Sequence, residues 1–170
     1  LEERQIDRLA KMSKRVADPR QTGLTPKNRA RLRVLQDDRK LRSLLELPDR
    51  VWAEAQSKPL KFNEAVRRET ALAILIMLYC PIRSQNLAQI HIERNLHRPG
   101  DGRVFLAFPA EEVKNSQPIE FELPRRVVRL IDKHMASRPV CLCPPATPWL
   151  FPRRDGAGPV DQGTLAQRLS

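Results

Sequence analysis

Two basic side chains, Arg83 and Lys114, stand where their charges could act on a bound anion. Arg83 follows an apolar segment that ends at Cys80 and Pro81, and Lys114 lies in the polar segment 112–116. A guanidinium can grip an oxyanion through a planar fork, or it can cap the carbonyl groups at the end of the preceding helix. A lysine whose pKa is lowered by neighbouring cations can donate a proton, whereas an ordinary turn lysine is only solvated. The residue types permit chemistry on an anion. The alternatives, an arginine that caps a helix and a lysine that is only solvated, stay open.

The overall charge favours a polyanionic partner. The 170 residues include 31 Lys and Arg against 20 Asp and Glu, a formal net charge of +11. Positive charge is most concentrated in the segment 20–42, where the only acidic residues are Asp37 and Asp38. Its eight basic residues are Arg20, Lys27, Arg29, Arg31, Arg33, Arg39, Lys40 and Arg42. Nucleic acid is the simplest partner for such a field, and a solvated helix face that serves solubility is the alternative. Aromatic residues make up only 5% of the chain, which does not favour a stacking platform for single strands.

Composition argues against several other classes of protein. The longest apolar run, 71–80, is about half the roughly 20 residues that a bilayer requires, so we expect no membrane partner. No basic-then-apolar leader is present, and three cysteines are too few for a disulfide framework, which favours a reducing cytoplasm. Cys141 and Cys143 lack the spacing of a zinc knuckle, and we interpret them as loop cysteines rather than metal ligands.

Helical periodicity covers most of the chain. Thr25 and Pro26 are typical of a helix start, and Asn63 is the expected cap of an apolar helix that Pro81 ends. That helix is apolar all round over 71–78, which predicts a central core helix containing Tyr79. The expected helices are 1–16, 27–35, 38–47 halted by Pro48, 49–55, 64–79, 84–88, 124–137, and one that begins near Gln162.

Between the expected helices 84–88 and 124–137, apolar residues alternate with polar ones, which is the pattern of β-strands. The segments 89–94, 103–108 and 117–123 predict three antiparallel strands, with turns at 99–102 and 113–116. Ile119, Phe121 and Leu123 are expected on one face. The predicted fold class is therefore α+β, mainly helical with a small three-stranded antiparallel sheet.

Three motifs in this order resemble the catalytic domain of tyrosine recombinases, the phage-integrase-type site-specific recombinases. The first is the helix-end turn Cys80-Pro81-Ile82-Arg83-Ser84-Gln85-Asn86-Leu87, and the second is Glu112-Val113-Lys114-Asn115-Ser116. The third is Leu150-Phe151-Pro152, which precedes Asp155-Gly156 and a helix start. The likeness covers roughly 37–170, so we expect 1–36 to be a basic helical linker at the end of an upstream DNA-binding domain.

The resemblance implies a role for each matching residue. Arg83 would neutralise the charge that grows on the scissile phosphate, and Lys114 would protonate the departing 5′-hydroxyl. Ser84 and Gln85 would contact the DNA backbone or cap the short helix, and the basic residues Lys27, Arg29, Arg31 and Arg33 would contribute to DNA binding. Asn86 replaces the glutamate of many relatives, so it can hydrogen-bond but supplies no charge.

The family would also supply partners and a reaction. The intact protein would cleave and rejoin double-stranded DNA through a 3′-phosphotyrosine, without metal or nucleotide cofactor, as a homo-tetramer on DNA in the bacterial cytoplasm and nucleoid. The sequence reaches neither the His-x-x-Arg box nor the nucleophile, and His91, His97 and His134 form no matching box. We therefore expect this fragment alone to be inactive in cleavage.

Two rival interpretations remain at this stage. One is a non-catalytic DNA-binding or regulatory module on a recombinase scaffold. The other is an unrelated α+β interaction domain whose basic surface serves solubility.

Overall fold

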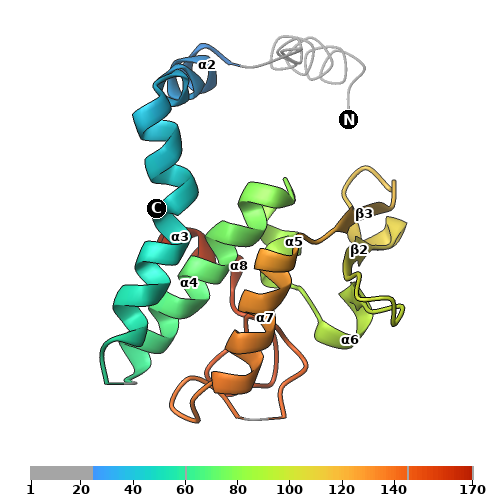
Figure 1. Ribbon diagram of the computed structural model, residues 1–170. Helices are drawn as coiled ribbons and strands as arrows, with labels where there is room; N and C mark the ends of the chain where they lie inside the picture. Colours follow the sequence, from blue (N-terminus) through green and yellow to red (C-terminus); the bar gives the residue numbers. More distant parts are fainter. Residues whose placement is uncertain (1–24, 60, 145, 170) are drawn as a thin grey trace, which may run out of the picture. The chain divides into compact units, whose positions relative to one another are not determined.

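The computed structural model describes residues 25–59, 61–144 and 146–169 (Figure 1). The chain divides into two compact units, Leu1–Arg42 and Ser43–Ser170, and each is described by itself. The helix expected over 1–16 lies outside the described residues.

The first unit contains a short basic helix. Helix α2 spans Pro26–Arg33, and its N-cap Thr25 accepts a hydrogen bond from the backbone N–H of Asn28 at 3.3 Å. The expected start at Thr25 and Pro26 is therefore confirmed. The 3₁₀ turn η1, Val34–Gln36, follows, and neither η1 nor α2 contains a buried residue. Helical propensity and the cap define this segment, since it contributes nothing to a core.

Helix α3 is longer than predicted. It spans Asp38–Gln56 as one helix with Pro48 inside it, so the predicted break at Pro48 is wrong. Proline removes one backbone N–H and costs about 3 kcal/mol in a helix interior. Here Pro48 is itself buried together with Trp52 and Ala55, and we attribute the continuity of the helix to the packing of this apolar face.

Helix α4, Phe62–Tyr79, is the central helix of the second unit. Its N-cap is Lys61, one residue before Phe62, so Asn63 is not the cap. Most of the apolar segment is buried as predicted, namely Ala71, Leu72, Ala73, Leu75 and Ile76. Tyr79 is an exception: it is 43% exposed rather than part of the core, and in the last turn of α4 its side chain hydrogen-bonds with Arg126 of α7.

The chain after α4 is less regular than predicted. Helix α5, Ser84–Ala88, matches its expected bounds. The strand expected over 89–94 is wrong: Ile92–Asn95 forms the short helix α6, and only Leu96–His97 forms strand β1. The side chain of Asn95 favours this local turn, because its Oδ1 accepts from the His91 N–H at 2.8 Å.

A small antiparallel sheet forms one end of the second unit. Strand β2 spans Phe105–Phe108 and β3 spans Ile119–Glu122, in the order β1-β2-β3. Leu106 pairs with Leu96 on one side and with Phe121 on the other. The alternation along β3 is confirmed, since Ile119 and Phe121 are half-buried while Glu120 and Glu122 are exposed.

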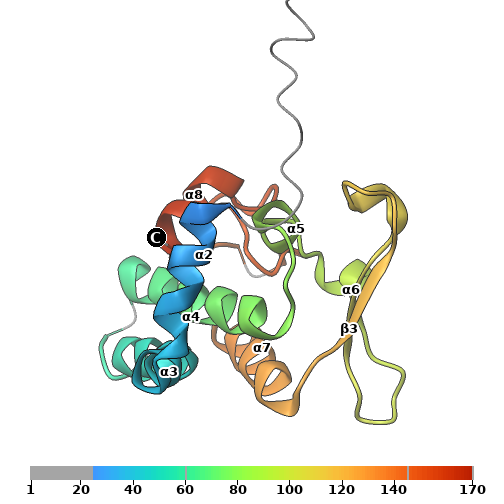
Figure 2. The same cartoon turned by 90° about the horizontal axis from the view of Figure 1, so that it is seen from above.

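Two further helices complete the second unit. Helix α7 spans Arg125–Ser137 and α8 spans Gln162–Leu169, both close to their predicted bounds. Helix α4 contacts both, and Figure 2 shows α7 on one side of α4 with α5 and α8 on the other. One apolar core joins these helices to the sheet. The structure thus confirms a mainly helical α+β unit with a three-stranded antiparallel sheet.

In the part of the chain that the structure describes, we find no helix with both the length and the apolar character needed to cross a bilayer.

Candidate nucleic-acid interface

Arg83 lies at the turn between α4 and α5. Cys80 closes α4 through a bond from its N–H to the Ile76 carbonyl at 2.7 Å, and Pro81 cannot continue the helix. Buried Ile82 anchors the chain to the core, and Arg83 is the extended N-cap residue of α5. Its guanidinium is exposed and makes no hydrogen bond or ion pair within the described residues. The alternative in which Arg83 caps the carbonyls of α4 is therefore wrong.

Lys114 lies on the turn between β2 and β3. The 3₁₀ turn η2, Ala110–Glu112, precedes it, and Val113 is buried and fixes the turn to the core. The N–H of Ser116 donates to the Val113 carbonyl at 2.8 Å, and Ser116 adopts a φ of +51°. Lys114 is thus held on an ordered turn while its side chain projects into solvent, with no ion pair among the described residues.

One buried side chain joins the segments that carry Arg83 and Lys114. Asn86, in the first turn of α5, is only 5% exposed, and its Nδ2 donates to the Glu112 carbonyl at 2.8 Å. This bond to a backbone carbonyl agrees with the expectation that Asn86 hydrogen-bonds without supplying charge. It places the start of α5 beside the turn that contains Lys114, and both views show the two segments on the same side of the second unit (Figures 1 and 2).

The Glu112 carboxylate, two residues before Lys114, is engaged elsewhere. Glu112 forms an ion pair with Arg94, and its Oε2 accepts from Asn95 Nδ2 at 3.1 Å. The Glu112 carboxylate therefore interacts with two residues of α6, and it forms no ion pair with Lys114 or Arg83. The two cations remain available to an external anion.

Ser84 and Gln85 occupy different environments. The Oγ atom of Ser84 accepts from Nε2 of Gln162, the first residue of α8, at 2.9 Å, so Ser84 helps to dock α5 on α8. Gln85 is exposed on the same short helix. Sequence reasoning missed Gln162, because the contact joins residues 78 positions apart and no local pattern indicates it.

The four basic residues Lys27, Arg29, Arg31 and Arg33 lie on α2 in the first unit. All four are exposed, and none forms an ion pair within the described residues. Their spacing of two residues distributes them around the helix rather than along one face. They form a cationic helix separate from the Arg83 segment.

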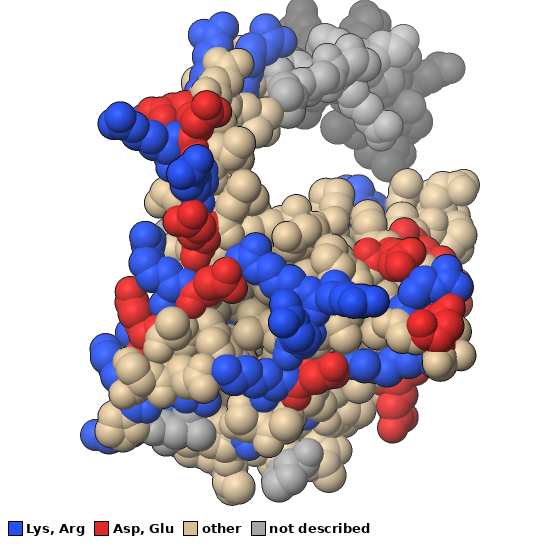
Figure 3. Space-filling model, viewed as in Figure 1, with Lys and Arg blue, Asp and Glu red and all other residues tan. Residues whose placement is uncertain are grey.

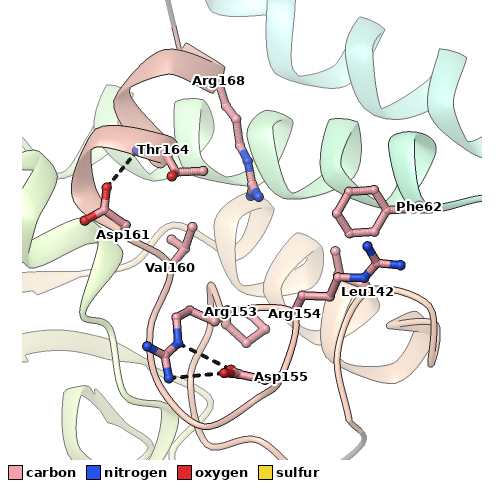
Figure 4. A pocket seen from close by; sticks show the side chains of 10 residues that line it. Phe62, Leu142, Arg153, Arg154, Asp155, Val160, Asp161, Thr164 and Arg168 are labelled. Atoms are coloured by element: carbon pink, nitrogen blue, oxygen red, sulfur yellow. Dashed lines mark hydrogen bonds and ion pairs between the residues drawn. The ribbon is translucent and has the colours of Figure 1, made fainter.

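A hollow of about 400 Å³ near the start of α4 carries three arginines (Figure 4). Each arginine is already engaged: Arg153 pairs with Asp155, Arg154 lies over the Phe62 ring, and Arg168 bonds to Glu69. Because these partners neutralise or cover the guanidinium groups, this hollow is a weaker anion site than the turn at Arg83.

The histidines and cysteines do not assemble reactive chemistry in the described residues. Burial lowers the pKa of His134 to about 3, so it is neutral at physiological pH, and burial raises the pKa of the Cys80 thiol to about 11. His91 forms an isolated β-bridge with Trp149, and His97 lies on β1. No group of three or more His, Cys, Asp or Glu residues in this part of the chain could hold a metal ion.

Comparison with protein-family models, with curated proteins and with solved structures finds no match to this chain.

Proposed function

We propose that this chain binds double-stranded DNA through the surface formed by α5 and the turn between β2 and β3. The observation that carries the proposal is the hydrogen bond from Asn86 to the Glu112 carbonyl, which joins the segments of Arg83 and Lys114. Both cations are exposed, and neither has a carboxylate partner among the described residues. An ordered pair of segments that presents an arginine and a lysine suits a phosphodiester, since Arg forms a bidentate contact and Lys supplies a mobile point charge.

We further propose that the intact protein is a site-specific DNA recombinase of the tyrosine type. This step rests on the order of the three motifs. In such an enzyme Arg83 neutralises the charge that develops on the phosphoryl oxygens, and Lys114 donates a proton to the 5′-oxygen that leaves. A tyrosine beyond the described residues supplies the nucleophile, and copies of the protein assemble on paired DNA sites. Neither Tyr79 nor a metal ion has a part in this scheme.

Duplex binding is tested by fluorescence anisotropy with labelled DNA over a range of salt concentrations. Removal of one phosphate contact reduces the slope of log K against log salt by about one, so Arg83→Ala and Lys114→Ala should each lower it by that amount. Arg50→Ala and Lys58→Ala are matched controls, since both residues are exposed and unpaired within the described chain. Equal effects of the control variants would contradict the assigned surface, and no binding at micromolar protein would favour the solubility interpretation.

Strand cleavage is tested separately with the longest product of the gene and a nicked duplex substrate. A protein–DNA adduct that survives denaturation, and that is lost in Arg83→Ala, supports the recombinase. A complex that stays non-covalent supports the binding module instead.

A further inference from the structure

A groove on the face of the second unit away from α5 has the features of a peptide-binding site. Two adjoining hollows, of about 460 and 630 Å³, lie between the loop that contains Gly102 and the start of α7. They share Gly102, Leu123 and Arg125 in their lining, so they form one continuous depression. Figure 2 shows α7 on the opposite side of α4 from α5, which separates this groove from the proposed DNA surface.

The charge of the groove is concentrated on α7. Arg125 and Arg129 are exposed, and neither forms a hydrogen bond or ion pair within the described residues. They lie four positions apart on a helix, a rise of about 6 Å, so both guanidinium groups stand on one ridge. Figure 3 shows Lys and Arg side chains gathered over α7 on this face.

The other walls are apolar or already neutralised. Leu123 is 5% exposed and Val128 is half-buried, and together they provide an apolar floor. On the loop side, Arg103 pairs with Asp101, while Glu122 is an exposed carboxylate at the end of β3. The groove therefore combines an apolar floor, a cationic rim on α7 and an acidic residue opposite.

We propose that this groove binds an acidic peptide segment of a partner protein, in an extended conformation with an apolar residue between two carboxylates. Carboxylates two residues apart on an extended chain lie about 7 Å from each other, which matches the spacing of Arg125 and Arg129. Because successive side chains of an extended chain point to opposite faces, the intervening side chain then points away from the two arginines, and the peptide backbone lies over Leu123 and Val128. Strand β3 is an edge strand of the sheet, and edge strands are common docking elements for extended peptides.

A nucleic acid fits this groove less well than a peptide. A phosphodiester strand carries a charge at every step, and the exposed carboxylate of Glu122 on one wall opposes such a continuous negative charge. A peptide carries charge only where its carboxylates lie, so it can place them beside Arg125 and Arg129 and present an uncharged stretch to Glu122. The apolar floor also offers no aromatic ring on which a base could stack.

The test uses the full chain and a short fluorescein-labelled peptide in which glutamate and leucine alternate. We expect saturable binding, and Arg125→Ala with Arg129→Ala should weaken it by about tenfold, as should replacement of every peptide glutamate by glutamine. Alanine is the best helix former, so circular dichroism should show α7 intact in this double variant. Arg50→Ala is the matched control and should leave peptide binding unchanged.

Duplex DNA distinguishes this proposal from the proposed function. The double variant should bind duplex as well as the unaltered protein does, because the groove is not on the DNA surface. Loss of duplex binding in the double variant would identify the groove as part of a nucleic-acid surface and overturn the proposal. Peptide binding that is equally strong with glutamine in place of glutamate, or equally reduced by Arg50→Ala, would also overturn it. A failure of duplex binding alone would affect only the proposed function.

Discussion

Glu69 is a fully buried carboxyl in the middle of α4. Its Oε2 accepts from Arg168 Nη1 at 3.0 Å, while its Oε1 lies 4.0 Å from Nε2 of His134, and neither of these last two atoms has a hydrogen-bond partner among the described residues. Burial raises the pKa of Glu69 to about 7, although the charges of Arg168 and Arg138 lower it in part. The carboxyl therefore exchanges its proton near neutral pH, next to a neutral imidazole.

Glu69→Gln should change the pH dependence of stability. The folded pKa of about 7 is above the ordinary value of 4.5, so the unaltered protein loses stability as the pH rises from about 4.5 to 7, and the loss is complete above that range. Glutamine has the same shape and does not titrate. The free energy of unfolding of the variant should therefore rise relative to the unaltered protein by about 3 kcal/mol across this window, as measured by urea denaturation.

The control for this experiment is His134, whose shift has the opposite sign. Burial, with the charge of Arg138, lowers its pKa from 6.5 to about 3, so the unaltered protein gains stability as the pH rises between these values. The free energy of unfolding of His134→Gln should therefore rise relative to that of the unaltered protein as the pH falls. If both variants differ from the unaltered protein by an amount that is constant with pH, neither group titrates in the fold as stated.

The proposed DNA surface depends on the contact between α5 and η2. Asn86→Ala removes the donor to the Glu112 carbonyl and leaves that acceptor without its side-chain partner, at a cost of about 1–2 kcal/mol. We expect faster hydrogen exchange on the turn at Lys114 and weaker duplex binding, while Arg83 itself is retained. Asn63→Ala is the matched control, since Asn63 is an exposed amide on α4 that makes no side-chain hydrogen bond within the described residues. Duplex affinity that is unaffected by Asn86→Ala would mean that the two segments act independently.

The accuracy of sequence-based expectations differed between kinds of element. The helices α5, α7 and α8 were predictable, since prolines and periodicity define their bounds locally. Pro48 was misleading, because the packing of a whole apolar face outweighs one missing hydrogen bond, and that packing is not visible from the residue alone. Residues 92–95 alternate like a strand, yet the Asn95 side chain satisfies the backbone of a helical turn.

The candidate site was predictable in its parts but not in its assembly. The positions of Arg83 and Lys114 follow from local turns, and both are exposed as their proposed roles require. The contacts that hold their segments, Asn86 with Glu112 and Ser84 with Gln162, join residues 26 and 78 positions apart. Such pairs depend on how helices pack, which periodicity does not specify.

The two units of the molecule contribute different things. The main apolar core lies entirely within Ser43–Ser170, whereas α2 and η1 bury no side chain. The described part of the first unit therefore offers cationic charge and little packing. Its four basic residues on α2 are suited to strengthen binding to a polyanion without affecting the stability of the core.

Deletion of residues 1–36 should separate these contributions. A chain that begins at Asp37 keeps the hydrogen bond from the Arg39 N–H to Asp37 Oδ1 at the start of α3, so that helix retains its N-terminal contact. We expect the calorimetric unfolding temperature to stay nearly the same, because the described part of the deleted segment, 25–36, contains no buried residue. The slope of log K against log salt should fall by about one for each lost basic residue that meets a phosphate, and the deletion removes ten basic residues, four of them on α2. A large drop in unfolding temperature would show instead that the first unit supports the core, and an unchanged salt slope would show that the basic residues of α2 make no phosphate contacts.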